Sequence, residues 1–204
     1  MIAAMIMLIL GLVLFLGIHS VRIVADGLRA RFMASHGPMA WKGVYSLIAI
    51  AGFALICIGF GQARHDTAVL WSPPRWTHDL AALLTLVAFV LVTAAYVPGN
   101  AIKARVKDPM ILGVKCWAAG HLLANGSPAD VVLFGSFLAW AVLDFRAARQ
   151  RRRAGAEPAI APAKRGRGAV VVVVGVLAWM LFALHLHQPL IGVAPFPGFH
   201  GIGH

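Results

Sequence analysis

The sequence predicts an all-α polytopic membrane protein, a bundle of about six transmembrane helices. Three observations support this prediction. Of the 204 residues, 60% are hydrophobic and only 12% are charged, whereas a soluble domain carries about 25% charged residues. The mean hydropathy of the chain is +0.82. The apolar residues are also gathered into runs near the ~20 residues that a helix needs to cross the hydrocarbon core of a bilayer.

Six apolar segments are separated by polar or turn-forming stretches. The first is interpreted as a retained anchor, because no basic segment precedes it and no small-residue cleavage site follows it. The fourth is short and contains Lys115 and His121, so it either spans the membrane or is re-entrant. A tight turn is predicted after it by the residue types of Asn125–Pro128. The predicted segments are Ile2–Ile18, Val44–Phe60, Leu80–Val97, Pro109–Ala124, Val131–Phe145 and Ala169–Leu186.

The domain organisation is predicted to be simple. Residues 1–204 form one integral membrane domain, and residues 149–168 form a basic cytoplasmic linker inside it. The linker is rich in Arg, Pro, Ala and Gly, a composition that predicts mobility and protease sensitivity. The two cysteines, Cys57 and Cys116, lie in apolar segments. They are too few for a disulfide framework or a CxxC metal site.

The distribution of Lys and Arg predicts the orientation. Four of these residues lie in residues 22–42, three in 103–107 and eight in 146–167, against only two, Arg64 and Arg75, in the alternate loop. The positive-inside rule places the three richer stretches in the cytoplasm and both termini outside. The formal net charge of +11 therefore faces an anionic lipid surface. Nucleic acid is excluded as a partner, because no basic face is interleaved with aromatic residues.

Histidines are the candidates for chemistry, since the chain has no nucleotide-binding glycine loop, no HExxH and no nucleophile elbow. Of nine histidines, His19 ends the first apolar segment and His121 lies inside the fourth. An ionisable group inside the membrane is costly to bury and is a functional hypothesis by default. Two neutral imidazoles from different helices suit a haem iron. The alternative is that each ring hydrogen-bonds another helix and serves packing alone.

The remaining histidines are assigned structural roles. His185 and His187 are two residues apart and therefore on different faces of a helix, which argues against a shared metal and favours anchoring at the membrane interface. His200 and His204 lie in the C-terminal tail, where adventitious metal binding is the only plausible chemistry. His65 and His78 lie at the edges of loops.

The few carboxylates have ordinary interpretations. Asp26 is spaced for a helical ion pair with Arg29. Asp108 precedes Pro109 and is placed to cap the fourth segment. Asp144 is expected to mark the membrane interface. None of these positions predicts general acid or base chemistry.

Four long stretches of the chain are distinctive: "LGIHSVRIVADGLRARF", "WKGVYSLIAIAGFALICIGFGQAR", "VPGNAIKARVKDPMILGVKCWAAGHLLANG" and "LFGSFLAWAVLDFRAARQRR". They closely resemble the NnrU family, and the resemblance covers nearly the whole chain. The family is named for an association with nitrite and nitric oxide metabolism in denitrifying bacteria. The resemblance thus implies a bacterial cytoplasmic (inner) membrane, and the termini that the charge distribution places outside are then periplasmic.

The NnrU family is similar to the plant zeta-carotene isomerase, an integral membrane enzyme that holds haem b. This similarity implies haem b and its iron bound by His19, in "IHS", and His121, in "WAAGH". The isomerase has a cysteine three residues before the second histidine, where this chain has Ala118. A second departure is "KDP" at residues 107–109, where relatives usually read His-Pro, a pair shared with membrane methyltransferases of the isoprenylcysteine type.

The depths of His19 and His121 place a condition on a shared iron. Six simple spans put His19 toward the cytoplasm and His121 in the outer half, with depths that differ by about 15–20 Å at ~1.5 Å per residue. A shared iron then requires the fourth and fifth segments to form a shallow re-entrant hairpin, or the first helix to be shifted.

Three functions are compatible with these observations. The first is a membrane haem b protein of nitrogen-oxide metabolism, acting as redox partner, sensor or isomerase-like enzyme. The second is a membrane methyltransferase relative with a cofactor pocket near residues 103–109. The third is a non-catalytic assembly or transport factor for denitrification enzymes. A Soret band selects the first, and binding of S-adenosylmethionine selects the second.

Overall fold

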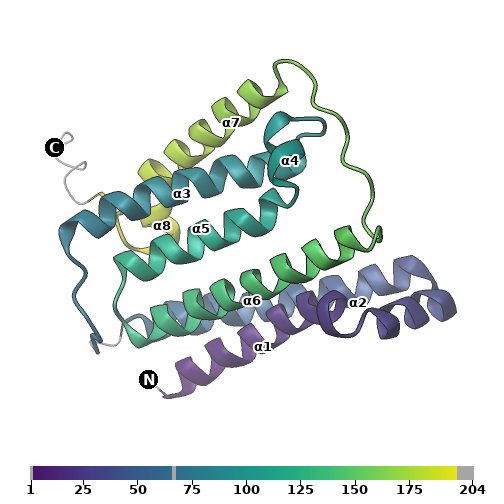
Figure 1. The fold of residues 1–204 in the computed structure, drawn as a ribbon. Coiled ribbons are helices and arrows are strands. Elements are labelled where there is room, and N and C mark those ends of the chain that lie inside the picture. The colour runs from purple at the N-terminus through teal and green to yellow at the C-terminus, as the bar shows by residue number, and fades with distance from the viewer. Residues whose placement is uncertain (1, 66–67, 197–204) are drawn as a thin grey trace. The chain divides into compact units, whose positions relative to one another are not determined.

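Every regular element of the computed structural model, which describes residues 2–65 and 68–196, is a helix (Figure 1). The all-α prediction is therefore confirmed over the described residues. The elements are α1 (Ile2–Val24), α2 (Asp26–Ala63), α3 (Arg75–Tyr96), α4 (Ala101–Val106), α5 (Pro109–Ala124), α6 (Pro128–Arg153) and α7 (Arg167–Leu181), followed by a π-helical turn (Phe182–Leu186) and α8 (His187–Ile191).

Five helical stretches are long and apolar enough to cross a membrane. They are α1, α2, α3, α6 and the continuous stretch Arg167–Ile191, while α5 is a shorter apolar helix of 16 residues. At ~1.5 Å per residue, α5 is about 24 Å long, against a hydrocarbon core of about 30 Å. The polytopic bundle is confirmed. Whether α5 spans the membrane or is re-entrant stays a prediction.

The chain divides into two compact units. Unit 1 comprises Met1–Ser72 and Asn125–Arg151, and therefore holds α1, α2 and most of α6. Unit 2 comprises Pro73–Ala124 and Arg152–His204, with α3, α4, α5, α7 and α8. The single domain predicted over residues 1–204 requires the two units to associate, and it stays a prediction.

In unit 1, α1 and α2 pack through glycines that let the two backbones meet. A Cβ atom on Gly11 would lie 2.6 Å from the backbone nitrogen of Ile56, and one on Gly52 would lie 2.7 Å from that of Phe15. A Cβ on Gly59 would also clash with the backbone of α1. Small residues drive such close packing inside membranes, where burial from water gives no attraction between helices. The Gly11, Gly52 and Gly59 contacts therefore fix the antiparallel register of α1 on α2.

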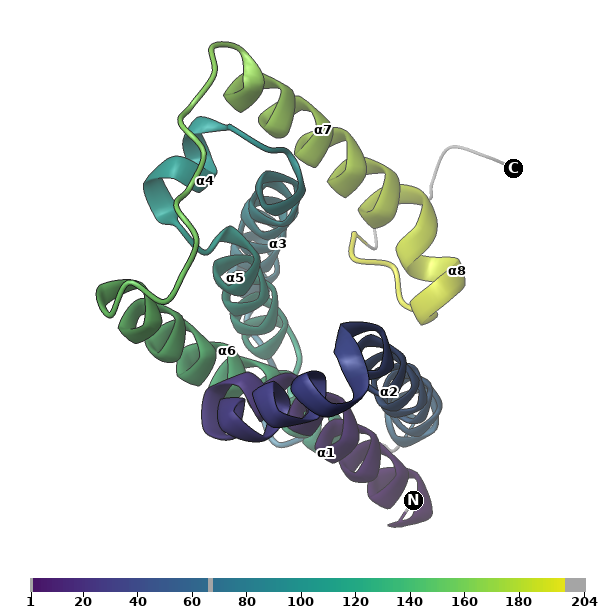
Figure 2. The ribbon, with the colours of Figure 1, turned by 90° about the vertical axis from the view of Figure 1, so that its right-hand side faces the viewer.

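In unit 2, α3 is the central helix, with α5 and α7 packed against it (Figures 1 and 2). A Cβ on Gly175 of α7 would lie 2.7 Å from Cα of Val90. The Trp179 indole donates a 3.0 Å hydrogen bond to Oγ1 of Thr85. Unit 2 thus combines a close glycine contact with a partly buried side-chain hydrogen bond across the same pair of helices, α3 and α7.

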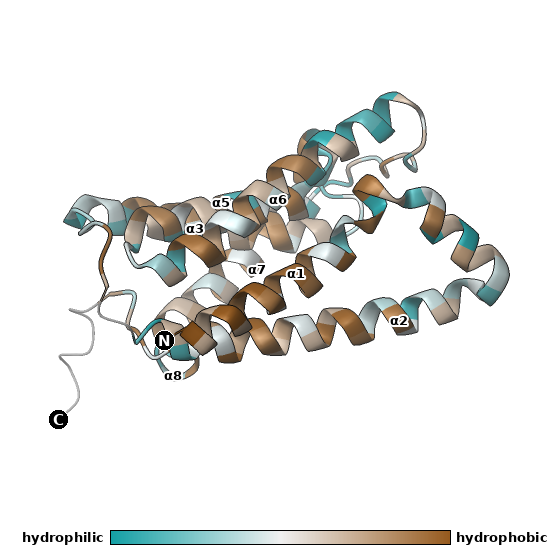
Figure 3. Ribbon diagram, turned by 90° about the horizontal axis from the view of Figure 1, so that it is seen from below, coloured by the Kyte–Doolittle hydropathy of each residue, from teal (hydrophilic) through white to brown (hydrophobic). Residues whose placement is uncertain are grey.

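The first two helices extend beyond their predicted ends. α1 continues past Ile18 to Val24, and the polar stretch that was expected as a loop is helical as well. Gly37 has a φ of 83° and breaks α2, and the following Pro38 occupies a position that favours the start of a helix. Figure 3 shows hydrophilic residues along this N-terminal part of α2 and hydrophobic ones along α1. Because this stretch is helical, charged side chains three residues apart can pair along it. The predicted ion pair between Arg29 and Asp26 is confirmed, at 2.6 Å.

The α6 helix begins at a side-chain cap and extends into the predicted linker. The Ser127 amide donates a 3.1 Å hydrogen bond to the Asp130 carboxylate, and the Asp130 amide donates a 3.2 Å hydrogen bond to the Ser127 hydroxyl. This reciprocal pairing is a capping box. Residues 149–153 of the linker are helical, and residues 154–166 are not. The mobility of the linker stays a prediction.

Substituting Gly11 by Ala should destabilise the protein by about 1–3 kcal/mol, because overpacking would force the α1 and α2 backbones apart. Gly17→Ala in the same helix is the matched control, since a Cβ there meets nothing within 4 Å. Thermal unfolding in detergent, followed by circular dichroism, measures both variants. Equal transition temperatures for the two would contradict the described packing.

Candidate functional site

His19 lies inside α1, about one and a half turns before the C-terminal end of the helix. Its Nδ1 lies 2.6 Å from the carbonyl oxygen of Phe15, four residues earlier. A carbonyl only accepts hydrogen bonds, so Nδ1 carries the proton and the neutral ring has its lone pair on Nε2. Within residues 2–65 and 68–196, Nε2 has no hydrogen-bond partner. The ring therefore presents a nitrogen that suits a metal ion.

Three aromatic rings from three helices surround His19, and we call this group the His19 cluster. The ring centroids of Phe15 (α1), Tyr45 (α2) and Trp140 (α6) lie 4.3, 5.2 and 6.0 Å from that of His19. The Trp140 ring stands almost perpendicular to the imidazole, at 87°. Its buried indole Nε1 has no acceptor among the described residues. The His19 cluster thus holds a lone pair and an unused hydrogen-bond donor among half-buried aromatic rings.

His121 repeats the same local arrangement in α5. Its Nδ1 lies 2.8 Å from the carbonyl oxygen of Trp117, again four residues earlier. The Trp117 ring lies beside it, with centroids 5.3 Å apart. Gly120 lies against α3, where a Cβ would be 3.3 Å from the Ala81 carbonyl oxygen. As for His19, the carbonyl contact assigns the proton to Nδ1 and the lone pair to Nε2.

His19 and His121 belong to different units, and each is therefore described within its own helices. α1 extends five residues beyond His19, or about 7.5 Å at ~1.5 Å per residue. His121 is three residues from the end of α5, level with the N-terminal part of α3. Joint ligation of one haem by the two histidines stays a prediction.

The helix geometry separates Cys116 from His121. The two residues are five apart on α5, which places them about 140° apart around the helix axis at ~100° per residue. Ala118, at the position where the isomerase has cysteine, is fully buried. The cysteine of this chain therefore does not share the face of His121, whereas Trp117 does.

The other histidines have local roles or lie at the surface. His187 has Nδ1 2.7 Å from the carbonyl oxygen of Val193, and His185, His65 and His78 are exposed. In the part of the chain that the structure describes, no group of three or more His, Cys, Asp or Glu residues could hold a metal ion. The predicted tail residues His200 and His204 lie outside the described residues.

Several contacts were not predicted from the sequence. Neither Tyr45 nor Trp140 was among the residues predicted for the site, yet both rings lie beside His19. Asp108 was expected to cap a helix, and its carboxylate instead accepts a 2.6 Å hydrogen bond from Arg152, 44 residues later. The hydrophobic periodicity of the sequence gives no sign of such contacts, because each contact joins segments that are distant in the sequence.

The fold defines a polytopic helical membrane protein, and His19 and His121, each within an apolar helix, are its candidate metal-ligating imidazoles. Residues 7–195 match the family model described as "NnrU protein". The chain belongs to the NnrU family, which confirms the resemblance seen in the sequence. Neither a comparison with curated proteins nor one with solved structures gave a match.

Proposed function

We propose that this NnrU-family protein binds haem b in the bacterial inner membrane, with His19 and His121 as iron ligands, and serves nitrite and nitric oxide metabolism. The observation that carries the proposal is the shared arrangement of the two rings. In both, Nδ1 contacts the carbonyl oxygen four residues earlier, at 2.6 Å for His19 and 2.8 Å for His121. Histidines that bind metals commonly donate the second ring N–H to a carbonyl or carboxylate, which fixes the tautomer.

The residues present fit a haem better than a metal ion held by protein groups alone. Haem iron needs only one or two axial protein ligands, and His19 and His121 would supply one imidazole each. The His19 cluster adds flat aromatic surfaces from Phe15, Tyr45 and Trp140. Its unused Trp140 N–H would find an acceptor in an oxygen-bearing group, and a haem carries carboxylates.

The residues of the chain have defined roles in this proposal. When bound, haem supplies one-electron chemistry and affinity for small gases. The Phe15 and Trp117 carbonyls orient the two imidazoles and hold their protons on Nδ1. The half-buried aromatic rings around His19 would limit access of water to a bound haem, and a low local dielectric is one of the factors that tune an iron centre. Nitrogen-oxide metabolism as the setting rests on the family association.

The proposed orientation follows from charge. The three basic stretches face the cytoplasm and both termini face the periplasm, because fifteen Lys and Arg residues lie on one side and two on the other. In this orientation His19 lies near the cytoplasmic end of α1, just before the basic stretch that begins at Arg22.

Haem binding is tested with wild type, His19→Ala and His121→Ala, expressed with added haem precursor and purified at equal protein concentration. Each substitution should remove the haem or convert a six-coordinate spectrum into a five-coordinate one, because an axial ligand is lost. Reduced-minus-oxidised visible spectra measure this.

The matched control is His187→Ala, which removes an imidazole whose Nδ1 also contacts a backbone carbonyl, at 2.7 Å. It should leave the spectrum unchanged. Wild-type protein without a Soret band would overturn the proposal, as would an unaltered band in the His19→Ala/His121→Ala double variant. If histidines only served packing, each substitution would cost just about 1–3 kcal/mol of stability.

Topology is tested with reporter fusions at two positions. A reporter placed after Arg151 should be active in the cytoplasm, because the basic stretch around this position is held on that side. A reporter placed after His204 should be active in the periplasm, because the last predicted span crosses the membrane between the two positions. Alkaline phosphatase and a fluorescent protein are suitable reporters of opposite preference. A cytoplasmic C-terminus would refute the proposed orientation.

A further inference from the structure

One end of unit 2 is strongly cationic, and we call it the basic end. It comprises the turn between α3 and α4, α4 itself, the corner between α4 and α5, and the stretch from Arg152 to Arg167. Asp108 and Glu157 are the carboxylates in the described stretches that form it. Its cationic residues include Lys103, Arg105, Lys107, Arg152, Lys164 and Arg167.

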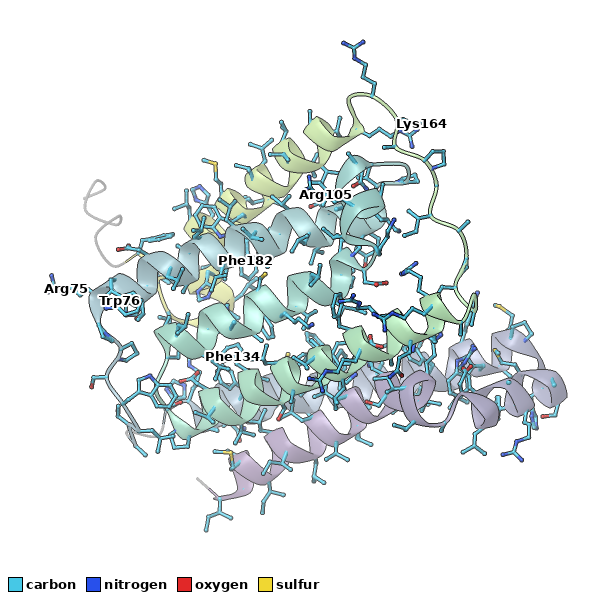
Figure 4. The ribbon with its side chains drawn as sticks, in the orientation of Figure 1. Arg75, Trp76, Arg105, Phe134, Lys164 and Phe182 are labelled. Atoms are coloured by element: carbon cyan, nitrogen blue, oxygen red, sulfur yellow. The ribbon has the colours of Figure 1, made fainter. Side chains whose placement is uncertain are left out.

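Backbone contacts bring the linker to this end. The Lys164 amide donates a 2.9 Å hydrogen bond to the Gly99 carbonyl, and the Arg167 guanidinium donates to the Pro98 carbonyl. A Cβ on Gly99 would lie 3.6 Å from Cγ of Lys164, so the linker lies directly over the α3–α4 turn. Figure 4 shows Arg105 and Lys164 at the same end of unit 2. Residues more than 50 positions apart thus form one cationic surface.

Arg152 has an unused hydrogen-bond donor at the basic end. Its Nη2 donates to Oδ1 of Asp108 at 2.6 Å, while its buried Nε has no acceptor among the described residues. Buried polar atoms almost always have a partner, and each exception calls for an explanation. Guanidinium groups bind phosphate oxygens through charge-assisted hydrogen bonds, often two at a time. An anionic oxygen at Nε would satisfy this donor.

The corner beside Asp108 holds a strained backbone. Lys107 has a φ of 71° and is the one non-glycine residue with positive φ among residues 2–65 and 68–196. Such a conformation costs about 1–3 kcal/mol and persists where the surroundings enforce it, often at ligand sites. Here it turns the chain sharply between α4 and α5. The turn keeps Lys107 next to the Asp108–Arg152 pair.

Apolar surface beside the basic end identifies the class of ligand. Val170, Val172 and Val173 in the first turns of α7 are exposed, as is Tyr96 at the end of α3. Tyrosine is enriched at the level of lipid headgroups. The cations therefore lie where the apolar helices end, with exposed valines nearby for an acyl chain. A nucleic acid or an acidic protein would use the charge but not the valines.

We propose that the basic end is a binding site for the phosphate headgroup of an anionic phospholipid, with Arg152 as its central donor. Basic pockets at the ends of membrane helices bind such headgroups. Lys107, adjacent to Asp108, and the other cations of the basic end would add positive potential around the phosphate, and the exposed α7 valines would contact the acyl chains.

Native mass spectrometry of the purified full chain, titrated with phosphatidylglycerol or phosphatidylcholine, tests the site. Arg152→Lys keeps the charge beside Asp108 but removes the Nε donor, and it should bind phosphatidylglycerol about tenfold more weakly, as for the loss of a charged hydrogen bond. Arg153→Gln is the control, since it removes an exposed charge from the adjacent position and should change binding little. Circular dichroism confirms that both variants are folded.

Three results would overturn the proposal. One is equal binding of phosphatidylglycerol and phosphatidylcholine by the wild type. Another is a loss in Arg153→Gln as large as that in Arg152→Lys, which would show general attraction by charge. The third is full displacement of the lipid by inorganic phosphate at millimolar concentration, which would identify a site for free phosphate.

Discussion

The bilayer leaves no water for polar groups, so each donor in a membrane helix must find its acceptor within the protein. In this chain the nearest acceptor is repeatedly the carbonyl oxygen four residues earlier. Ser20 donates to Leu16 at 2.6 Å and Thr93 to Phe89 at 2.8 Å in this way. His19 and His121 use the same bond. For a hydroxyl the bond only satisfies a donor, whereas for an imidazole it also selects the tautomer and assigns the lone pair to Nε2.

Close packing of α1 against α2 determines which side chains surround His19. Gly11 and Gly52 allow α1 and α2 to touch, and the resulting register brings Tyr45 to the level of His19. Trp140 of α6 completes the His19 cluster. The glycines therefore act on the site indirectly, since they decide which aromatic side chains reach the imidazole. The same helices expose apolar side chains such as Val13 and Leu47, as expected for surfaces that contact lipid.

The sequence predicted the fold class, because apolar length and charge position are local signals. It also located the two candidate histidines and the family. Helix ends were predicted less well, because α1 and α6 run past their apolar cores into polar residues. The Ser127–Asp130 capping box begins α6 before its apolar core, and the basic C-terminal ends of both helices are helical despite their polarity. The contacts of Trp140 and Arg152 were beyond prediction, because they depend on the rotation of one helix against another. A single sequence carries no signal for that rotation.

The central claim is that backbone carbonyls hold the protons of His19 and His121 on Nδ1 and so present Nε2 to iron. Nitrogen NMR of haem-free protein labelled with ¹⁵N at histidine, assigned with the single His→Ala variants, measures the tautomer at each ring. Protons on Nδ1 of both residues, at a pH where the rings are neutral, are the expected result. Protons on Nε2 of either residue would contradict the account, because its Nε2 would then have no lone pair for iron.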